Sequence, residues 1–276
     1  LRYLSYGNYD GKKWSSATPY GRQFDGYGAN YLTSVALANA GYASYTVSID
    51  VYGNNYLLPY YTDLDDCLYE IQTSDVKYTG STANAYICYY IAYDYVADGA
   101  IPNSKLTLGK YADFEEDYRA FVYENYLTVG AGVDGYLDEI IAAQKFDKSD
   151  PDIFKKVAKY IQGAAKYNLK YDKALDGESN IVLSFLRDYK EGICQHYASA
   201  ATLLYRRLGI PARYVAGYTG ETKAGEKVEL TGKNAHAWTE VYIDGMGWVC
   251  VEVTGGTGLS QGGGDGMKIS PVNEYH

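Results

Sequence analysis

Three side chains in the C-terminal half of the chain could together act as a nucleophile, a base and a group that orients the base. Cys194 follows Gly192-Ile193, His236 lies in an Ala-His-Ala-Trp segment, and Glu252 lies in a Val-Glu-Val-Thr segment. A thiol attacks carbonyl groups, an imidazole accepts the thiol proton, and a carboxylate fixes the imidazole tautomer. The sequence therefore predicts acyl transfer through a covalent thiol intermediate, with Cys194, His236 and Glu252 as the catalytic residues.

The nucleophile is expected at the start of a helix. The apolar pattern predicts a helix over residues 194–208, and Gly209 stands where helices commonly stop. Cys194 would then lie at the positive end of this helix, which favours the thiolate and lowers the pKa of the thiol. The free N–H groups of the first turn could also stabilise the oxyanion that forms when a carbonyl is attacked.

The base and the carboxylate are expected on the two strands of one hairpin. Strand patterns flank a tight connection at residues 244–247. A turn centred there places His236 opposite residues 252–254. The side chains of His236 and Glu252 then point to one face of the sheet, and the helix has only to pack against that face.

The remaining elements predict an α+β fold in three parts. Residues 1–108 alternate short strand patterns with turn residues and indicate a β-rich, Tyr-rich module with at most one helical turn, around residues 63–71. Residues 109–254 indicate the catalytic domain, and residues 255–276 a flexible Gly-rich tail. The predicted elements are helices at residues 111–127, 136–143, 151–166 and 180–186, and strands at residues 45–52, 85–95, 212–219, 235–243 and 248–253.

Composition and charge narrow the class of protein. The chain has 276 residues, of which 47% are hydrophobic and 21% charged, so it can bury a core. A net charge of −9 argues against nucleic acid or an anionic membrane as a partner. No stretch approaches the ~20 apolar residues of a membrane span. The chain begins without Met or a signal peptide, so we expect a piece of a longer protein, with any anchor in a missing segment.

The other reactive side chains have structural interpretations. Cys250 is expected in the core, whereas the spacing of Cys67 and Cys88 leaves both a disulfide and two buried thiols open. His196, close to Cys194 on the same helix, is expected to make a structural hydrogen bond. Because no Cys or His cluster has ligand spacing, we expect no metal and no cofactor. The 34 tyrosines are expected on half-exposed sheet faces rather than stacked on a ligand.

Four segments between residues 188 and 254 resemble the transglutaminase-like superfamily and cover about a quarter of the chain. They are EGICQHYA at residues 191–198, LGIPARYVAGY at 208–218, AHAWTEVY at 235–242 and GWVCVEVT at 247–254. The segment of residues 4–14 is also similar to one that precedes such domains in membrane-anchored bacterial members. That similarity implies the extracellular or cell-surface part of a bacterial protein.

The resemblance implies a papain-like α+β core, in which a helix that carries the Cys packs on an antiparallel sheet, and a Cys-His-Asp triad. Cys194 and His236 match the nucleophile and the base of the family. The third position differs from the family pattern, because the family usually has Asp before Pro-Thr and this chain has Glu252-Val253-Thr254. Glu is one methylene longer than Asp, so the imidazole would be held from a different angle. No second oxyanion donor is assigned among the residues before Cys194.

Four functions are compatible with these residues, and the first is favoured. It is a cysteine peptidase or amide hydrolase, in which water resolves the acyl-enzyme. The second is transfer of a glutamine acyl group to an amine, which cross-links proteins, and the two differ in how well the site excludes water. Deglycosylation also occurs in the superfamily, and a non-enzymatic surface binding module is the fourth. The expected partner is a protein or peptide substrate, with cell-wall peptide included.

Overall fold

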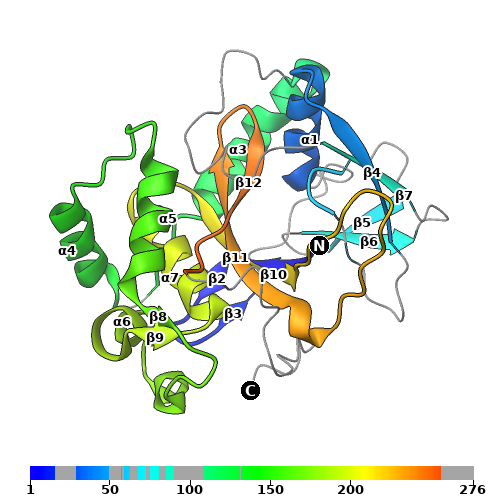
Figure 1. Ribbon diagram of the computed structural model, residues 1–276. Helices are drawn as coiled ribbons and strands as arrows, with labels where there is room; N and C mark the ends of the chain where they lie inside the picture. The colour runs from blue at the N-terminus through cyan, green and yellow to red at the C-terminus, as the bar shows by residue number, and fades with distance from the viewer. Residues whose placement is uncertain are drawn as a thin grey trace.

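A four-stranded antiparallel sheet forms the centre of the protein and joins strands from the two ends of the chain (Figure 1). The computed structural model describes residues 1–15, 29–49, 57, 59–62, 68–72, 75–80, 85–89, 108–130 and 132–255. The strands lie in the order β1–β10–β11–β12. Their bounds are β1 (Arg2–Tyr6), β10 (Ala212–Tyr218), β11 (Ala235–Ile243) and β12 (Gly247–Val251).

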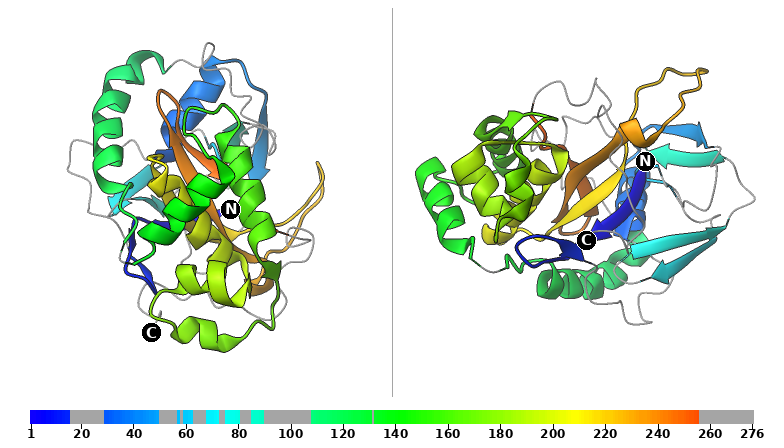
Figure 2. Two further views of the ribbon diagram at one scale, coloured as in Figure 1. Left: turned by 90° about the vertical axis from the view of Figure 1, so that its left-hand side faces the viewer. Right: turned by 90° about the horizontal axis from the view of Figure 1, so that it is seen from below.

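Helices cover this sheet from two sides. Helix α7 packs along β10 and β11, helices α4, α5 and α6 pack in turn on α7, and α1 packs on β12 (Figures 1 and 2). In the described part of the chain no helix has the length and apolar character to cross a bilayer. The helices are α1 (Ala29–Asn39), α3 (Ala112–Asn125), α4 (Asp134–Gln144), α5 (Ile153–Ala164), α6 (Ile181–Ser184) and α7 (Cys194–Arg207).

Smaller elements surround the central sheet. They are β2 (Asn8–Tyr9), β3 (Trp14–Ser15), β4 (Ser44–Ser48), β5 (Leu68–Gln72), β6 (Asp75–Gly80), β7 (Ala85–Tyr89), β8 (Lys166–Tyr167) and β9 (Glu191–Gly192), with single turns η2 (Gly109–Tyr111), η3 (Lys173–Gly177), η4 (Phe185–Tyr189) and η5 (Gly232–Asn234). The strands pair as β2–β3, β4–β7, β5–β6 and β8–β9. Only the last of these pairs is parallel.

Strand β11 is buried on both faces, which fixes its position in the core. On one face Thr239 Oγ1 donates to the Ala198 carbonyl of α7 at 3.0 Å and lies 3.1 Å from Thr202 Oγ1. On the other face the Trp238 indole N–H donates to the Tyr60 hydroxyl, which in turn donates to Glu240. Because alternate residues of a strand point to opposite faces, His236, Trp238 and Glu240 share the second face.

The α+β fold class is confirmed, and the elements after residue 109 follow their sequence patterns. Helix α7 ends at Arg207, and Gly209 adopts a φ of +78°, the conformation expected after a helix stop. Asn180 caps α6, because its Oδ1 accepts the Leu183 N–H at 3.0 Å. Helix α5 begins at Ile153 rather than at Pro151, because Asp150 instead accepts the N–H of Asp152 in a turn.

The N-terminal part is less purely β than the expected β-rich module. Residues 29–39 form helix α1, and the described part of the expected helical turn, residues 68–71, belongs to strand β5. Strand β1 is hydrogen-bonded to β10, with Ser5 opposite Val215, so the first residues belong to the sheet of the expected catalytic domain. The division at residue 108 therefore does not apply to β1. Cys67 and residues 256–276 lie outside the described residues, so neither the disulfide nor the tail is addressed.

Many tyrosines are core residues rather than half-exposed sheet residues. Tyr118, Tyr126, Tyr197 and Tyr205 are each 0% exposed. The Tyr197 hydroxyl donates to the Ala165 carbonyl at 2.6 Å, and the Tyr118 hydroxyl accepts the Trp248 indole N–H at 2.8 Å. A buried Tyr is stable when its hydroxyl has a partner, so Tyr118 and Tyr197 fill the core where Phe would ordinarily serve.

Candidate active site

Cys194 occupies the first position of helix α7, after Ile193 in extended conformation. Cys194 is buried, with 3% of its surface exposed to solvent. The backbone N–H groups of Ala237, Gln195 and Cys194 itself lie close enough to the sulfur to favour the thiolate and so act to lower the pKa of the thiol. Ala237 follows His236 on β11, so the start of α7 lies at the strand that carries the candidate base. The body of α7 contacts the face of β11 that carries Thr239, whereas His236 points to the opposite face, so the expected packing of the helix on the His236 face is wrong.

The hairpin that carries His236 and Glu252 has the predicted register. Ile243 pairs with Gly247 and Thr239 with Val251, so the turn is centred on Gly245, which has a φ of +72°. Continued in the same register, the ladder would place Thr254 opposite His236, within the predicted range. The two side chains meet on the same side: His236 Nε2 lies 2.6 Å from Glu252 Oε2.

The longer Glu side chain is accommodated by folding back on its own backbone. Glu252 Oε1 accepts the N–H groups of Val253 at 2.9 Å and Thr254 at 2.7 Å. This leaves Oε2 for the imidazole, and Glu252 is 8% exposed. The extra methylene therefore does not prevent a direct carboxylate–imidazole contact.

The ring of His236 is supported from its sheet side by Trp238. The two rings stack with centroids 6.1 Å apart and an interplanar angle of 27°. Trp238 is fixed in turn by Tyr60, which is held by Glu240. Since Glu252 occupies Nε2, Nδ1 is the nitrogen of His236 that remains to exchange a proton.

Burial disfavours the charged form of all three groups. It raises the pKa of the Cys194 thiol to about 11, against the opposing effect of the backbone N–H groups. It also lowers the pKa of His236 to about 4 and raises the pKa of Glu252 to about 7. The expected low thiol pKa is therefore wrong for this state, because desolvation of the sulfur outweighs the helix start. A proton has to leave the thiol during the reaction itself.

His196 makes the expected structural hydrogen bond, and its other ring nitrogen faces a carboxylate that the sequence did not indicate. Its Nδ1 accepts the N–H of Ile193 at 3.1 Å, and its Nε2 faces Asp176 Oδ1 at 3.5 Å. Asp176 lies in η3, far from α7 in sequence, and no local pattern connects the two. In the described residues no group of three or more His, Cys, Asp and Glu side chains could hold a metal ion.

The fold and these contacts define a class of protein: an α+β structure in which a helix that begins with a thiol packs on an antiparallel sheet with an imidazole–carboxylate pair. Residues 138–253 match the family model of the transglutaminase-like superfamily. The chain thus contains a transglutaminase-like domain, as the resemblance implied. Cys194, His236 and Glu252 all lie within the matched residues, while their catalytic roles stay a prediction.

Two relatives match short parts of the chain. The protein YebA of Bacillus subtilis strain 168 is 47% identical over 85 residues, which are 29% of this chain and 12% of the relative. A protein-glutamine gamma-glutamyltransferase of Pseudomonas aeruginosa is 43% identical over 72 residues, 25% of this chain and 11% of the relative. The chain therefore spans only a small part of each of these relatives.

Solved structures support the fold over most of the chain. The periplasmic domain of TgpA from Pseudomonas aeruginosa, bound to ethylmercury, superposes with a TM-score of 0.57 at 19% identity, covering 94% of this chain and 83% of that one. A second structure of the same domain gives a TM-score of 0.55 at 20% identity, with coverages of 91% and 80%. At this identity the likeness extends to the fold alone, and it includes the N-terminal part that the family model leaves unmatched.

Proposed function

We propose that this protein is a thiol acyl-transfer enzyme that acts on carboxamide groups of proteins or peptides through a Cys194–His236–Glu252 triad. The observation that carries the proposal is the 2.6 Å contact between His236 Nε2 and Glu252 Oε2 at the strand whose Ala237 N–H reaches the Cys194 sulfur. A non-catalytic surface module would have no need of a buried carboxylate against this imidazole, since burial of both groups costs stability.

The reaction begins with a neutral thiol and a neutral imidazole. Cys194 Sγ bonds to the carbonyl carbon while its proton passes to His236 Nδ1, and Glu252 accepts from Nε2–H and stabilises the imidazolium. The N–H groups of Cys194 and Gln195 are the donors available for the oxyanion. The C–N bond then breaks, the leaving ammonia or amine takes the proton from Nδ1, and a thioester remains on Cys194.

Two nucleophiles can resolve the thioester. Water gives the free acid, the hydrolase reaction that the sequence favours, and an amine gives a new amide. Two observations favour the amine: the site is nearly closed to solvent, with Cys194 and His236 at 3% and 5% exposed, and a relative carries the name of a protein-glutamine gamma-glutamyltransferase. In both routes the incoming group gives its proton to His236 Nδ1 as the thioester breaks.

The location of the reaction is part of the same proposal. The fold is shared with a periplasmic domain, and the segment of residues 4–14 is similar to segments that precede surface-exposed members. We infer an extracellular or cell-surface domain whose substrates are surface proteins or cell-wall peptides.

Intact-protein mass spectrometry tests the proposal. The protein is incubated with a glutamine-containing peptide, with and without a primary amine, and Cys194→Ala serves as the control. An adduct on Cys194 that turns over to an amine-linked peptide establishes amine transfer, and turnover to free acid or cleaved peptide establishes hydrolysis. If a panel of such peptides gives no adduct with the wild-type protein, the proposed reaction is wrong.

A further inference from the structure

His196 holds Ile193, the residue before the candidate nucleophile, by both of its backbone polar groups. The backbone N–H of His196 donates to the Ile193 carbonyl at 2.9 Å, and its ring Nδ1 accepts the Ile193 N–H at 3.1 Å. This is the reciprocal arrangement of a helix cap, with an imidazole in the place where Glu or Gln usually reaches back. Ile193 is bonded directly to Cys194, so any movement of this residue moves the thiol.

The ring of His196 is locked in this position by its neighbours. Phe185 stacks on it with centroids 5.6 Å apart, Tyr171 meets it edge-on at 4.9 Å, and the residue is 2% exposed. A Cβ atom at Gly192 would lie only 2.6 Å from His196 Nδ1. The glycine is therefore required for the ring to lie against the backbone that leads into α7.

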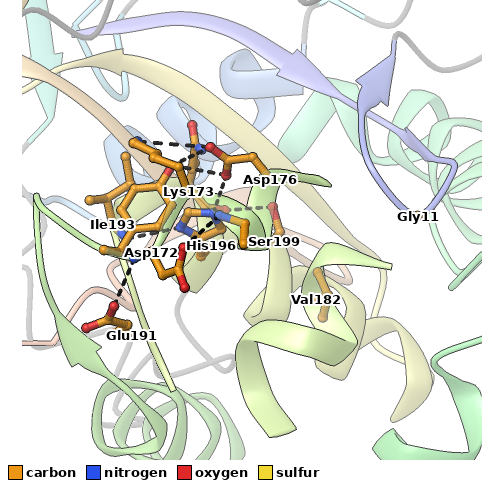
Figure 3. A network of polar contacts seen from close by, with 12 residues as sticks. Gly11, Asp172, Lys173, Asp176, Val182, Glu191, Ile193, His196 and Ser199 are labelled. Carbon is orange, nitrogen blue, oxygen red and sulfur yellow. Dashed lines mark hydrogen bonds and ion pairs between the residues drawn. The ribbon is translucent and has the colours of Figure 1, made fainter. Parts of the chain in front are cut away.

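The contact with Ile193 selects one tautomer of His196. Nδ1 can accept a hydrogen bond only when it carries no proton, so the proton of the neutral ring lies on Nε2. Nε2 faces Asp176 Oδ1 at 3.5 Å (Figure 3). The Tyr171 hydroxyl donates to the same carboxylate at 2.9–3.0 Å. A nearby carboxylate favours this tautomer, because it attracts the N–H that faces it.

Further contacts close this arrangement into a clasp around the start of α7, formed by residues 168–176 and 191–196. Glu191 accepts the Asp172 N–H at 2.9 Å and the Asn168 side-chain N–H at 2.9 Å. The Asn168 backbone N–H donates to the Gly192 carbonyl at 2.9 Å. The segment that leads to Cys194 is thus held on both sides, and His196 is the member of the clasp that contacts Ile193.

We propose that His196 is a positioning residue for Cys194: by holding the Ile193 peptide, with its tautomer set by Asp176, it fixes the sulfur and the first-turn N–H groups in the geometry for attack. This inference rests on the proposed function. It assigns to His196 an effect on thiol reactivity, which exceeds the structural hydrogen bond expected from the sequence. Small displacements of a reacting group can reduce a rate by about 100-fold.

Two substitutions of His196 separate positioning from stability. In His196→Asn the side-chain Oδ1 takes the place of Nδ1 and can accept the Ile193 N–H, while the ring contacts with Phe185 and Tyr171 are lost. In His196→Leu the side chain has no acceptor for the Ile193 N–H. Both variants lose buried ring contacts, so both should unfold at lower temperature. Tyr189→Phe, which removes a hydroxyl that donates to Glu178 in the same region, is the matched control.

Two measurements are made on the full chain. The first is the rate of Cys194 alkylation by iodoacetamide, followed by peptide mapping, with His236→Ala as reference. We expect a loss of about 10-fold or more in His196→Leu, and a rate within about threefold of wild type in His196→Asn and Tyr189→Phe. The second is hydrogen exchange of the Ile193 amide, which should lose protection in His196→Leu and keep it in His196→Asn.

The outcomes distinguish this inference from the function on which it rests. Equal alkylation rates and equal Ile193 protection in the Leu and Asn variants would overturn the positioning role. Rates that follow thermal stability in both variants would leave His196 merely structural and also overturn it. If Ile193 protection changes as expected but wild type, His236→Ala and both His196 variants react at one rate, the proposed triad is wrong instead.

Discussion

The protein has one imidazole–carboxylate pair at His236 and another at His196, close to Cys194 on the same helix, and the two pairs differ in closeness and in solvent exposure. His236 and Glu252 meet at 2.6 Å, with both side chains at most 6% exposed. His196 and Asp176 are 3.5 Å apart, and the Asp176 side chain is 43% exposed. The contact between His236 and Glu252 is therefore short and buried. The contact between His196 and Asp176 is longer, and its carboxylate is exposed to solvent.

The difference follows from what each imidazole has to do. A ring that exchanges a proton with a thiol needs its tautomer and orientation fixed throughout the reaction, and a close buried carboxylate does this at a cost in stability. A ring that holds a backbone N–H needs only an unprotonated Nδ1, for which a distant carboxylate suffices. Closeness of the carboxylate is therefore the structural sign that separates the candidate base from the positioning residue.

Removal of the candidate base should have the largest effect. His236→Ala deprives the thiol of its proton acceptor while its pKa stays near 11, so we expect acylation by a glutamine-containing peptide to fall by about 1000-fold or more. Single-turnover mass spectrometry of Cys194 measures this. His196→Asn, at the other pair, is the control, and a similar loss there would abolish the distinction between the two rings.

Neutralising the close carboxylate should have the next largest effect. Glu252→Gln removes the acceptor for Nε2–H, and we expect acylation to fall by about 100-fold. Stability should change in the opposite sense. Burial raises the pKa of Glu252 from its ordinary value of 4.5 to about 7. The protonated side chain therefore contributes to the stability of the folded protein below about pH 4.5, and this contribution is lost as the pH rises through 7.

Denaturant unfolding at about pH 5 and about pH 8 measures this second effect. The stability of Glu252→Gln relative to wild type should rise between the two pH values, because the variant has no buried carboxylate to ionise. A constant difference would mean that Glu252 is ionised in the folded protein at both values.

Neutralising the distant carboxylate should have a much smaller effect. In Asp176→Asn the Nδ1 contact with Ile193 persists, so we expect alkylation of Cys194 to fall by no more than about threefold. The comparison with Glu252→Gln is made under one condition with iodoacetamide. If Asp176→Asn is as damaging as Glu252→Gln, closeness does not separate the two pairs.

The pH dependence should show the smallest change. With a His236 pKa of about 4 and a Cys194 pKa of about 11, the neutral thiol–imidazole pair is present throughout the range between them. Wild-type alkylation should therefore vary little from about pH 5 to about pH 9, whereas His236→Ala should gain about tenfold per pH unit. A wild-type rate with the same steep rise would show that His236 accepts no proton.

Local patterns were sufficient for the helix start and the hairpin. Gly209 and the Asp244–Gly247 connection fix where α7 and β11 end, and alternation along the strands brings His236 to Glu252. Burial was not predictable in this way. Whether the helix start or desolvation decides the pKa of Cys194 depends on how tightly α7 packs on β11, which is a tertiary property.

Contacts between distant segments account for the other departures. The sequence of helix α1 mixes Tyr and Thr with Ala, which gives it only a weak local preference for the helical conformation. The helix is stabilised by packing on β12. Asp176 meets His196 only because η3 folds over the start of α7. The expectation that the tyrosines are half-exposed was wrong for the buried ones. A buried Tyr needs a hydrogen-bond partner for its hydroxyl, such as the Ala165 carbonyl for Tyr197, and the composition of the chain does not show that partner.

The pairing of β1 with β10 has a consequence for how the protein folds. Arg2 lies opposite Gly217, so most of the chain must be looped out before this edge of the sheet can form, and such distant pairings form slowly. Until β1 docks, β10 offers unpaired backbone groups that a strand of another molecule could occupy. Substitutions in β1 should therefore show first as aggregation during refolding at high protein concentration, before any change in the chemistry at Cys194.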